Sequence, residues 1–373
     1  MHKPTPGASR SRRSFMRNAA RALAATPLAG LAGAAPLPHP LRLGIDLFSI
    51  RSQGWDAFQL LDYAAGLGVS LAHFSEPRFL GSREENHLRK LKAHADRLGL
   101  AMEVGMGSIC PTSKRFLASE GSAEEQLRRM FGVARLLGSP IVRAYLGASV
   151  DRQGPAPLDA HIDATVKVLR SVRGQARDQG LKIALENHAG DLQAREMKAL
   201  IEEAGRDFVG SCLDSGNPLW AIEDPHLTLE TLAPYVLTTH IRDSAVWEEP
   251  RGIAVQWTAM GEGTIGIDRW VSRFAEVCPG KPLSLEIIVT RQPRIHNYQD
   301  PAFWDAFRST PAWEFARFLR LARQGSPRYP PEPPAGVAAG SPEYKAFLVA
   351  EERRDLERSI QYCKQALGAG RSG

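Results

Sequence analysis

The feature that most constrains the fold is a regular alternation of short apolar runs with amphipathic segments. Each run has the length and composition of a buried parallel strand. The eight runs are residues 41–50, 69–74, 100–106, 141–146, 182–188, 208–213, 236–241 and 283–289. Segments between them, such as 84–98 and 123–137, carry apolar residues at helical spacing, and Gly99 and Gly138 follow at typical helix C-cap positions. This alternation predicts a parallel α/β fold.

Eight strands alternating with helices over about 250 residues fit a closed (β/α)₈ barrel. The alternative is an open doubly wound sheet, which usually carries a Gly-rich phosphate-binding turn after its first strand. Residues 48–54 show no such pattern. We therefore expect a barrel over residues 41–324, followed by a Pro-rich linker and a charged C-terminal helix over 325–373, with Ser341 as the N-cap of that helix.

The first 40 residues are typical of a targeting segment. Residues 11–16 (SRRSFM) form a twin-arginine pattern, an Ala/Leu/Gly-rich stretch covers 19–35, and residues 32–34 supply small side chains for cleavage. The apolar stretch contains Pro27 and is short for a stable membrane span. We expect export to the periplasm by the twin-arginine route; a disordered basic leader without an address is the alternative.

Charge and cysteine content narrow the class of function. The net charge of +6 arises in the leader, which holds six basic and no acidic residues and leaves 41 of each in the rest of the chain. A balanced body argues against a nucleic-acid partner. The four cysteines show no close paired spacing, and Cys212 lies in an apolar run. We expect Cys212 to be a buried free thiol. The sequence does not decide whether the other cysteines form a disulfide.

Four acidic or imidazole side chains stand on four successive predicted strands. Glu186, Asp214 and His240 end the fifth, sixth and seventh runs, and Glu286 lies in the eighth. Because the carboxyl ends of barrel strands share one face, these side chains should meet. Two glutamates, an aspartate and a neutral imidazole suit Mn²⁺ foremost, with Mg²⁺, Co²⁺ or Zn²⁺ as alternatives. A cation would also relieve repulsion among the carboxylates, so we expect one divalent metal ion.

The segments around these residues resemble the xylose-isomerase-like barrel superfamily, which includes sugar isomerases, ketose 3-epimerases and inosose dehydratases. The resemblance covers residues 41–290 and is carried by ALENH (184–188), CLDSGN (212–217), HIRD (240–243), GEG (261–263) and LSLEI (283–287). It implies that the four residues hold the metal and that Glu186 and Glu286 are the catalytic acid/base pair. One position departs: ketose epimerases usually carry His three residues after the metal Asp, where this chain has Asn217. This departure argues against a free-ketose epimerase.

Other residues near the strand ends are candidates for substrate contact. His188, two residues after Glu186, could bind a hydroxyl or act as a catalytic base. Arg242, two after His240, should also face inward unless it pairs with Asp243. Further candidates are His73, Glu76, Arg143, Tyr145, Asn217 and Trp257. Trp257 is predicted to lie in a long loop over 244–260, where it would stack on a sugar ring or serve packing.

Three functions fit these observations. The first is a metal-dependent isomerase or epimerase of a carbohydrate or cyclitol, which removes a proton next to a carbonyl through a metal-stabilised enediolate. The second is a lyase that carries out β-elimination or dehydration on a keto-sugar, keto-glycoside or inosose; export favours it, since phosphorylated cytoplasmic sugars are not available outside. The third is a non-catalytic sugar-binding barrel, which predicts a missing ligand, and none is missing. The sequence does not decide whether the chain forms a homo-oligomer.

Overall fold

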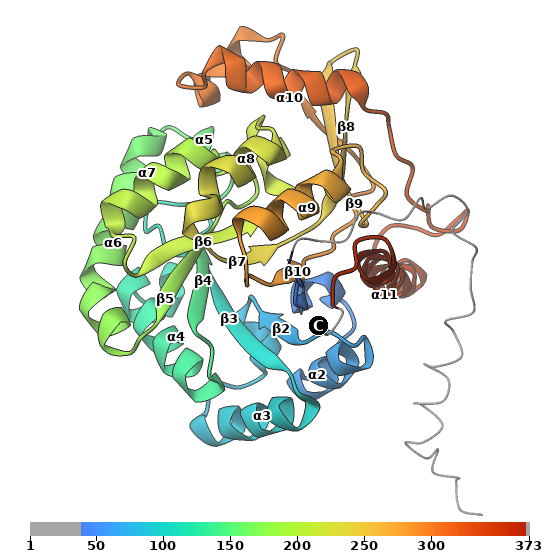
Figure 1. Cartoon of the computed structure of the whole chain (residues 1–373). Coiled ribbons are helices and arrows are strands. Elements are labelled where there is room, and N and C mark those ends of the chain that lie inside the picture. Colours follow the sequence, from blue (N-terminus) through green and yellow to red (C-terminus); the bar gives the residue numbers. More distant parts are fainter. Residues whose placement is uncertain (1–38, 371–373) are drawn as a thin grey trace, which may run out of the picture. The chain divides into compact units, whose positions relative to one another are not determined.

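Eight parallel strands form the centre of the computed structural model, which describes residues 39–370 (Figure 1). In spatial order they are β10 (Leu283–Leu285), β1 (Leu43–Asp46), β2 (Leu71–Phe74), β3 (Ala101–Ser108), β4 (Ile141–Tyr145), β5 (Lys182–Glu186), β6 (Val209–Asp214) and β7 (Val236–His240). A bridge between Ile241 and Leu285 joins the two ends of the sheet, and Ile241 donates its N–H to the Ser284 carbonyl at 2.8 Å. The predicted (β/α)₈ barrel is confirmed, because an open sheet would leave these edges apart.

The first and last predicted strands end four residues before the ends of the apolar runs that indicated them. The first ends at Asp46, and the one-turn 3₁₀ helix η1 (Leu47–Ile50) follows. The Asp46 side chain accepts the Phe48 N–H at 2.6 Å, which caps that helix and stops the strand. The last strand ends at Leu285, so Glu286 lies just beyond the sheet. A carboxylate therefore stands at the end of β1 (Asp46) and directly after β10 (Glu286), at the mouth of the barrel.

Helices follow the strands and cover the outside of the barrel (Figure 1). They are α2 (Ala57–Gly66), α3 (Glu85–Leu98), α4 (Ala123–Leu137), α5 (Ser149–Arg152), α6 (Leu158–Asp178), α7 (Ala194–Ala204), α8 (Pro225–Leu232) and α9 (Ile267–Val277). The predicted caps Gly99 and Gly138 both adopt φ of +70°, a left-handed conformation that glycine reaches without strain. Each glycine directly follows its helix, where it lets the chain turn toward the next strand.

The segment after β7 is not the long loop that the sequence indicated. It forms two antiparallel strands, β8 (Asp243–Glu249) and β9 (Gly252–Thr258), which β11 (Arg294–His296) extends to three. The physical reason is a hairpin with a tight turn, where Gly252 adopts φ of +135° and lies against the His296 carbonyl. We call β8, β9 and β11 the accessory sheet. It lies beside the 3₁₀ helix η6 (Pro301–Phe307) and α10 (Ala312–Gln324), at the upper edge of Figure 1.

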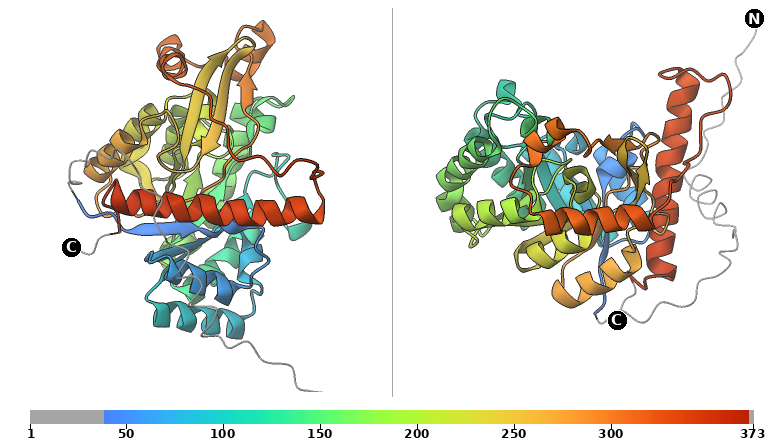
Figure 2. Two further views of the ribbon diagram at one scale, coloured as in Figure 1. Left: turned by 90° about the vertical axis from the view of Figure 1, so that its right-hand side faces the viewer. Right: turned by 90° about the horizontal axis from the view of Figure 1, so that it is seen from above.

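The chain ends in a long helix, α11 (Pro342–Gln365), which runs along the barrel beside α2 (Figure 2). Ser341 caps this helix by accepting the Tyr344 N–H at 3.1 Å, as the sequence predicted. The Tyr63 hydroxyl of α2 donates to Glu357 of α11 at 2.9 Å. The helix therefore packs on the barrel exterior instead of forming a separate core.

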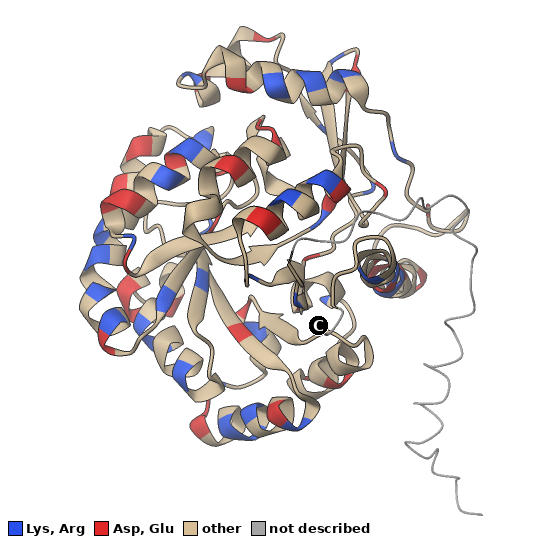
Figure 3. Ribbon diagram, viewed as in Figure 1, with Lys and Arg blue, Asp and Glu red and all other residues tan. Residues whose placement is uncertain are grey.

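Three further expectations concern the targeting segment, membrane-spanning helices and the cysteines. The twin-arginine motif and its apolar stretch fall in residues 1–38, outside the described part of the chain. Within residues 39–370, we find no helix with the length and apolar character that crossing a bilayer requires. Each of the four cysteines lies in the described residues and is a buried free thiol, as expected for Cys212. Basic and acidic residues are interspersed along the outer helices (Figure 3).

Candidate metal centre

The structure brings the four predicted metal ligands together at the mouth of the barrel. One ligand atom from each of Glu186, Asp214, His240 and Glu286 lies within 4.8 Å of all the others. Strand register produces this meeting, because Asp214 pairs with His240 in adjacent strands and the Ile241–Leu285 bridge places Glu286 beside them. All four side chains are buried, with Glu286 the most exposed at 6%. These donors, far apart in the chain, thus form one shielded cluster.

The donor set fits a divalent cation, and the His240 imidazole gives the most specific sign of it. Its Nδ1 lies 2.9 Å from Glu186 Oε2 and 3.4 Å from Glu286 Oε2. Yet this buried nitrogen has no hydrogen-bond partner of acceptable geometry among the described residues. The nitrogen faces two carboxylates without a hydrogen bond to either. A nitrogen that binds the same metal ion as those carboxylates would lie in this way. Glu186, Asp214, His240 and Glu286 are the residues that would hold it.

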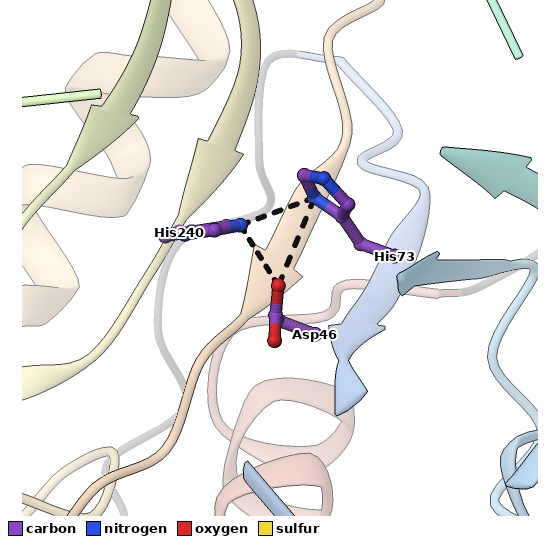
Figure 4. Close-up of side chains that lie close together, drawn as sticks. All are labelled: Asp46, His73 and His240. Atoms are coloured by element: carbon purple, nitrogen blue, oxygen red, sulfur yellow. Dashed lines mark hydrogen bonds and ion pairs between the residues drawn. The ribbon is translucent and has the colours of Figure 1, made fainter. Parts of the chain in front are cut away.

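The other nitrogen of His240 is held from the opposite side by Asp46 and His73 (Figure 4). His240 Nε2 lies 3.0 Å from Asp46 Oδ2 and 3.1 Å from His73 Nδ1. If His73 or Asp46 accepts a proton from Nε2, Nδ1 is left free, which is how metal-binding histidines are usually oriented. His73 was predicted to contact substrate, and the structure buries it against His240 instead. Asp46, which sequence reasoning missed, ends β1 just as Glu186, Asp214 and His240 end their strands.

Two buried arginines compensate the charge of the ligand carboxylates. Arg143 Nε lies 2.5 Å from Glu186 Oε2, and Arg242 Nη2 lies 2.5 Å from Asp214 Oδ2 and also contacts Glu286. Their exposures are 4% and 1%. Both were predicted to face the site, and Arg242 does so rather than pairing with its sequence neighbour. The cluster therefore contains fixed positive charge even before any cation is bound.

The carboxyl groups respond differently to this environment. Burial raises the pKa of Asp214 to about 7, and the Arg242 guanidinium offsets it only partly. Burial also opposes ionisation of Glu286, but Arg242 and His240 together outweigh it and lower that pKa to about 2. For Glu186, burial is outweighed by Arg143 and His240 together, which hold its pKa well below the usual range. Three carboxyl groups this close do not ionise independently, and a divalent cation would relieve the repulsion.

His188 lies at the edge of the cluster, with its ring stacked on Tyr145 at 3.8 Å and 13°. Its Nδ1 lies 2.6 Å from the Gly147 carbonyl oxygen. Since a carbonyl only accepts, Nδ1 carries the proton and Nε2 keeps its lone pair. Burial lowers the pKa of His188 to about 4, although Glu186 opposes this effect. The imidazole is therefore neutral and has an unprotonated nitrogen.

Side chains that follow the strand ends closely hold the candidate ligands in place, and sequence reasoning missed two of them, Asn187 and Asp191. Asn187 exchanges two hydrogen bonds with the Asp214 backbone, at 3.0 and 2.9 Å. Asp191 accepts the His188 N–H at 2.9 Å and fixes the loop that carries this histidine. Asn217 donates to Glu186 Oε1 at 3.1 Å, so this predicted substrate contact touches a candidate metal ligand. A polar residue one to five positions beyond a strand-end ligand was the available signal.

Two predicted substrate contacts have other partners. Glu76 stands before the 3₁₀ helix η2 (Pro77–Leu80) and pairs with Arg78 at the surface. Trp257 lies in β9, is only 7% exposed, and stacks on Trp220 at 4.3 Å and 10°. The face of Trp257 is thus already covered by protein. The accessory sheet explains this difference, because it carries Trp257 inward rather than leaving it on an open loop.

Known proteins share this architecture. A curated relative, the 3-oxo-isoapionate decarboxylase of Pectobacterium atrosepticum, is 25% identical over 234 residues, which span 62% of this chain and 72% of that protein. A crystal structure of D-psicose 3-epimerase in the presence of D-fructose superposes with a TM-score of 0.58 at 14% identity, covering 88% of this chain and all of the other.

A second solved structure, a xylose isomerase-like TIM barrel protein from Mycobacterium smegmatis in complex with magnesium, gives a TM-score of 0.53 at 15% identity, over 76% of this chain and 96% of that one. The model of one protein family, described as xylose isomerase-like TIM barrel, matches residues 50–304. This span is well over half of the chain and includes all four candidate ligands. The chain therefore belongs to the xylose isomerase-like TIM barrel family.

Proposed function

We propose that the chain is a divalent-metal-dependent sugar isomerase or epimerase that removes a proton from a carbon next to a carbonyl. The observation that carries this proposal is the cluster of Glu186, Asp214, His240 and Glu286, with the His240 Nδ1 atom facing carboxylates without a hydrogen bond. Family membership supports an enzyme, and the magnesium in one structural neighbour supports the metal. Mn²⁺ remains our first choice of ion for this oxygen-rich set.

The side chains divide the chemistry among them. A bound divalent cation would polarise the substrate carbonyl and offset the charge of the enediolate. Glu186 and Glu286 act as the acid/base pair, one accepting the proton from carbon and the other returning a proton. His188 offers a third proton acceptor at its unprotonated Nε2. Arg143 and Arg242 place buried positive charge where negative charge develops, and burial keeps water from competing.

The experiment that tests this proposal measures the exchange of substrate carbon-bound hydrogen with solvent deuterium. The Mn²⁺-loaded protein is incubated in D₂O with a panel of keto-sugars and keto-glycosides, and products are read by NMR and mass. We expect deuterium next to the carbonyl together with a new stereoisomer or an aldose–ketose interconversion. Glu186→Gln and Glu286→Gln should each slow exchange by about 100-fold or more. Metal binding without exchange on any substrate would refute the enzyme and leave a sugar-binding barrel.

A matched control separates loss of chemistry from loss of fold. Glu223 is a buried glutamate outside the cluster, which accepts the Ala194 N–H at 3.0 Å and the Thr228 hydroxyl at 2.6 Å. Glu223→Gln should keep exchange within about twofold, since it changes a buried carboxyl group without touching the proposed ligands. Loss of exchange in this variant would mean that the assay reports on folding.

A lyase is the second candidate, and two observations favour it. The curated relative is named as a decarboxylase of a 3-oxo acid, and two arginines are buried beside the ligands. Arginine pairs well with a substrate carboxylate. Breaking the carbon–carbon bond to that carboxylate would release carbon dioxide and leave its electron pair in the same kind of enediolate. Carbon dioxide or an unsaturated product in the assay would select the lyase over the isomerase.

We also propose export to the periplasm, which the pattern at residues 11–16 supports. The test is cell fractionation of the full chain and of a double variant, Arg12→Lys with Arg13→Lys. Export by this route predicts periplasmic wild-type protein and cytoplasmic retention of the variant. Equal distribution of the two would contradict the proposal.

A further inference from the structure

A stack of four side chains connects the accessory sheet to the candidate metal centre. Arg294 of β11 lies over the Trp220 ring at 4.8 Å, and Trp220 stacks on Trp257 of β9. The guanidinium carbon of Arg242 lies 4.4 Å from the Trp257 ring centroid. We call Arg294, Trp220, Trp257 and Arg242 the Arg–Trp stack. Its inner end is the arginine that contacts two of the proposed ligands.

The surrounding backbone leaves little room for the inner end of the stack to move. A Cβ atom at Gly216 would lie 2.5 Å from Arg242 Cγ and 3.1 Å from Trp257 Cδ1, so the arginine stem crosses a position that only glycine leaves open. The backbone N–H of Trp257 donates to the Thr290 hydroxyl at 3.0 Å, which anchors the strand that carries the indole. Both rotation and retreat of the guanidinium are therefore obstructed.

The hydrogen bonds of Arg242 leave part of its guanidinium group to be held by the face of the Trp257 ring. Its Nη2 contacts Asp214 and Glu286, whereas its buried Nε has no hydrogen-bond partner among the described residues. The guanidinium is thus held by one edge and by the face of Trp257. A guanidinium stays charged even when buried, and a cation–π contact is worth most where water is excluded. The indole therefore contributes directly to where this charge lies.

We propose that Trp257, backed by Trp220, is a positioning residue that holds Arg242 against Asp214 and Glu286. In that place the guanidinium competes with a divalent cation for the two carboxylates and supplies a fixed charge beside the substrate. The accessory sheet is then part of the active centre and not an appendage to it. The catalytic part of this inference rests on the proposed function, while the positioning itself does not.

The test measures Mn²⁺ affinity by calorimetry on metal-free full-length protein. Trp257→Leu removes the aromatic face and should tighten Mn²⁺ binding about 3- to 10-fold, because Arg242 then yields its carboxylates more easily. Trp257→Phe keeps an aromatic face and should stay within about twofold of wild type. Trp247→Leu is the matched control, since Trp247 lies on the neighbouring strand opposite Ala254, and it should leave the affinity unchanged.

A double-mutant cycle shows whether Trp257 acts through Arg242. Arg242→Met removes the competing charge and should tighten Mn²⁺ binding about 10-fold or more. In that background Trp257→Leu should change the affinity by less than about twofold. Unchanged or weaker Mn²⁺ binding by folded Trp257→Leu protein would overturn the proposal, as would an equal effect of this substitution in both backgrounds.

Failure of the proposed function would be recognised separately. If the wild-type protein binds no Mn²⁺, the metal-dependent function fails, and the same cycle is then read from the thermal midpoint of the metal-free protein. The stack predicts that Trp257→Leu lowers the midpoint more when Arg242 is present than in the Arg242→Met background. Equal lowering in both backgrounds would overturn the stack by itself.

Discussion

Replacing Asp46 with asparagine should weaken Mn²⁺ binding without unfolding the barrel. Asp46 Oδ1 accepts the Phe48 N–H at 2.6 Å and the Ser75 hydroxyl at 2.9 Å, whereas Oδ2 faces His240 Nε2 at 3.0 Å. An asparagine would keep its single oxygen on the side of the two donors. Its amide NH₂ would then face the Nε2–H of His240, so two donors would oppose each other in a fully buried place.

The expected size of the effect follows from the role of such carboxylates. Removing the outer partner of a metal-binding histidine typically costs about 10- to 100-fold in metal affinity, which equals about 1.4–2.7 kcal/mol. The structure places this substitution in that range, because Asp46 and His73 are the groups that contact Nε2 and only one of them is lost. The change should therefore not abolish binding.

Calorimetric titration of metal-free wild type and Asp46→Asn with Mn²⁺ is the assay, with circular dichroism as the check on folding. Ser75→Ala is the control, since it removes only one hydrogen bond to the far oxygen of Asp46 and should change affinity by less than about threefold. Wild-type affinity in a folded Asp46→Asn protein would refute the idea that this carboxylate orients His240 toward a metal.

Three other perturbations test separate parts of the structure. Gly216→Ala puts a methyl group 2.5 Å from Arg242 Cγ and should cut turnover at least about tenfold while the melting temperature falls only a few degrees; unchanged turnover would mean that the Arg242 stem has other room. Asp191→Ala frees the loop that carries His188 and should lower kcat more than it raises KM, whereas an effect on KM alone would count against His188 as a proton acceptor. Burial raises the pKa of Glu223 from 4.5 to about 8, so the native state keeps a proton that the unfolded chain loses, and stability should decline by about 1.4 kcal/mol per pH unit as pH rises through that window. Denaturant midpoints across this range should show that Glu223→Gln lacks this part of the decline; equal slopes would argue that Glu223 is ionised in the native state.

The meeting of the four candidate metal ligands could be predicted because their positions follow from local order along the chain. An apolar run that ends in Glu186, Asp214 or His240 marks the carboxyl end of a strand, and parallel strands bring all such ends to one face. The helix caps at Gly99 and Gly138 were equally local, since a left-handed residue after a helix is a property of a few adjacent positions. These features needed no knowledge of which strands are neighbours.

The partners of those ligands were decided by tertiary structure. Asp46 and His73 contact His240 across the closed barrel, from positions separated by 194 and 167 residues, and no short-range pattern encodes such a meeting. Trp257 was assigned to a loop, whereas it lies in β9 of the accessory sheet. Strand alternation alone predicts that Arg242 points inward. Its pairing with Asp214 and its stacking on Trp257 depend on how the sheet closes and on where the accessory sheet packs, and those distances exist only in the folded chain.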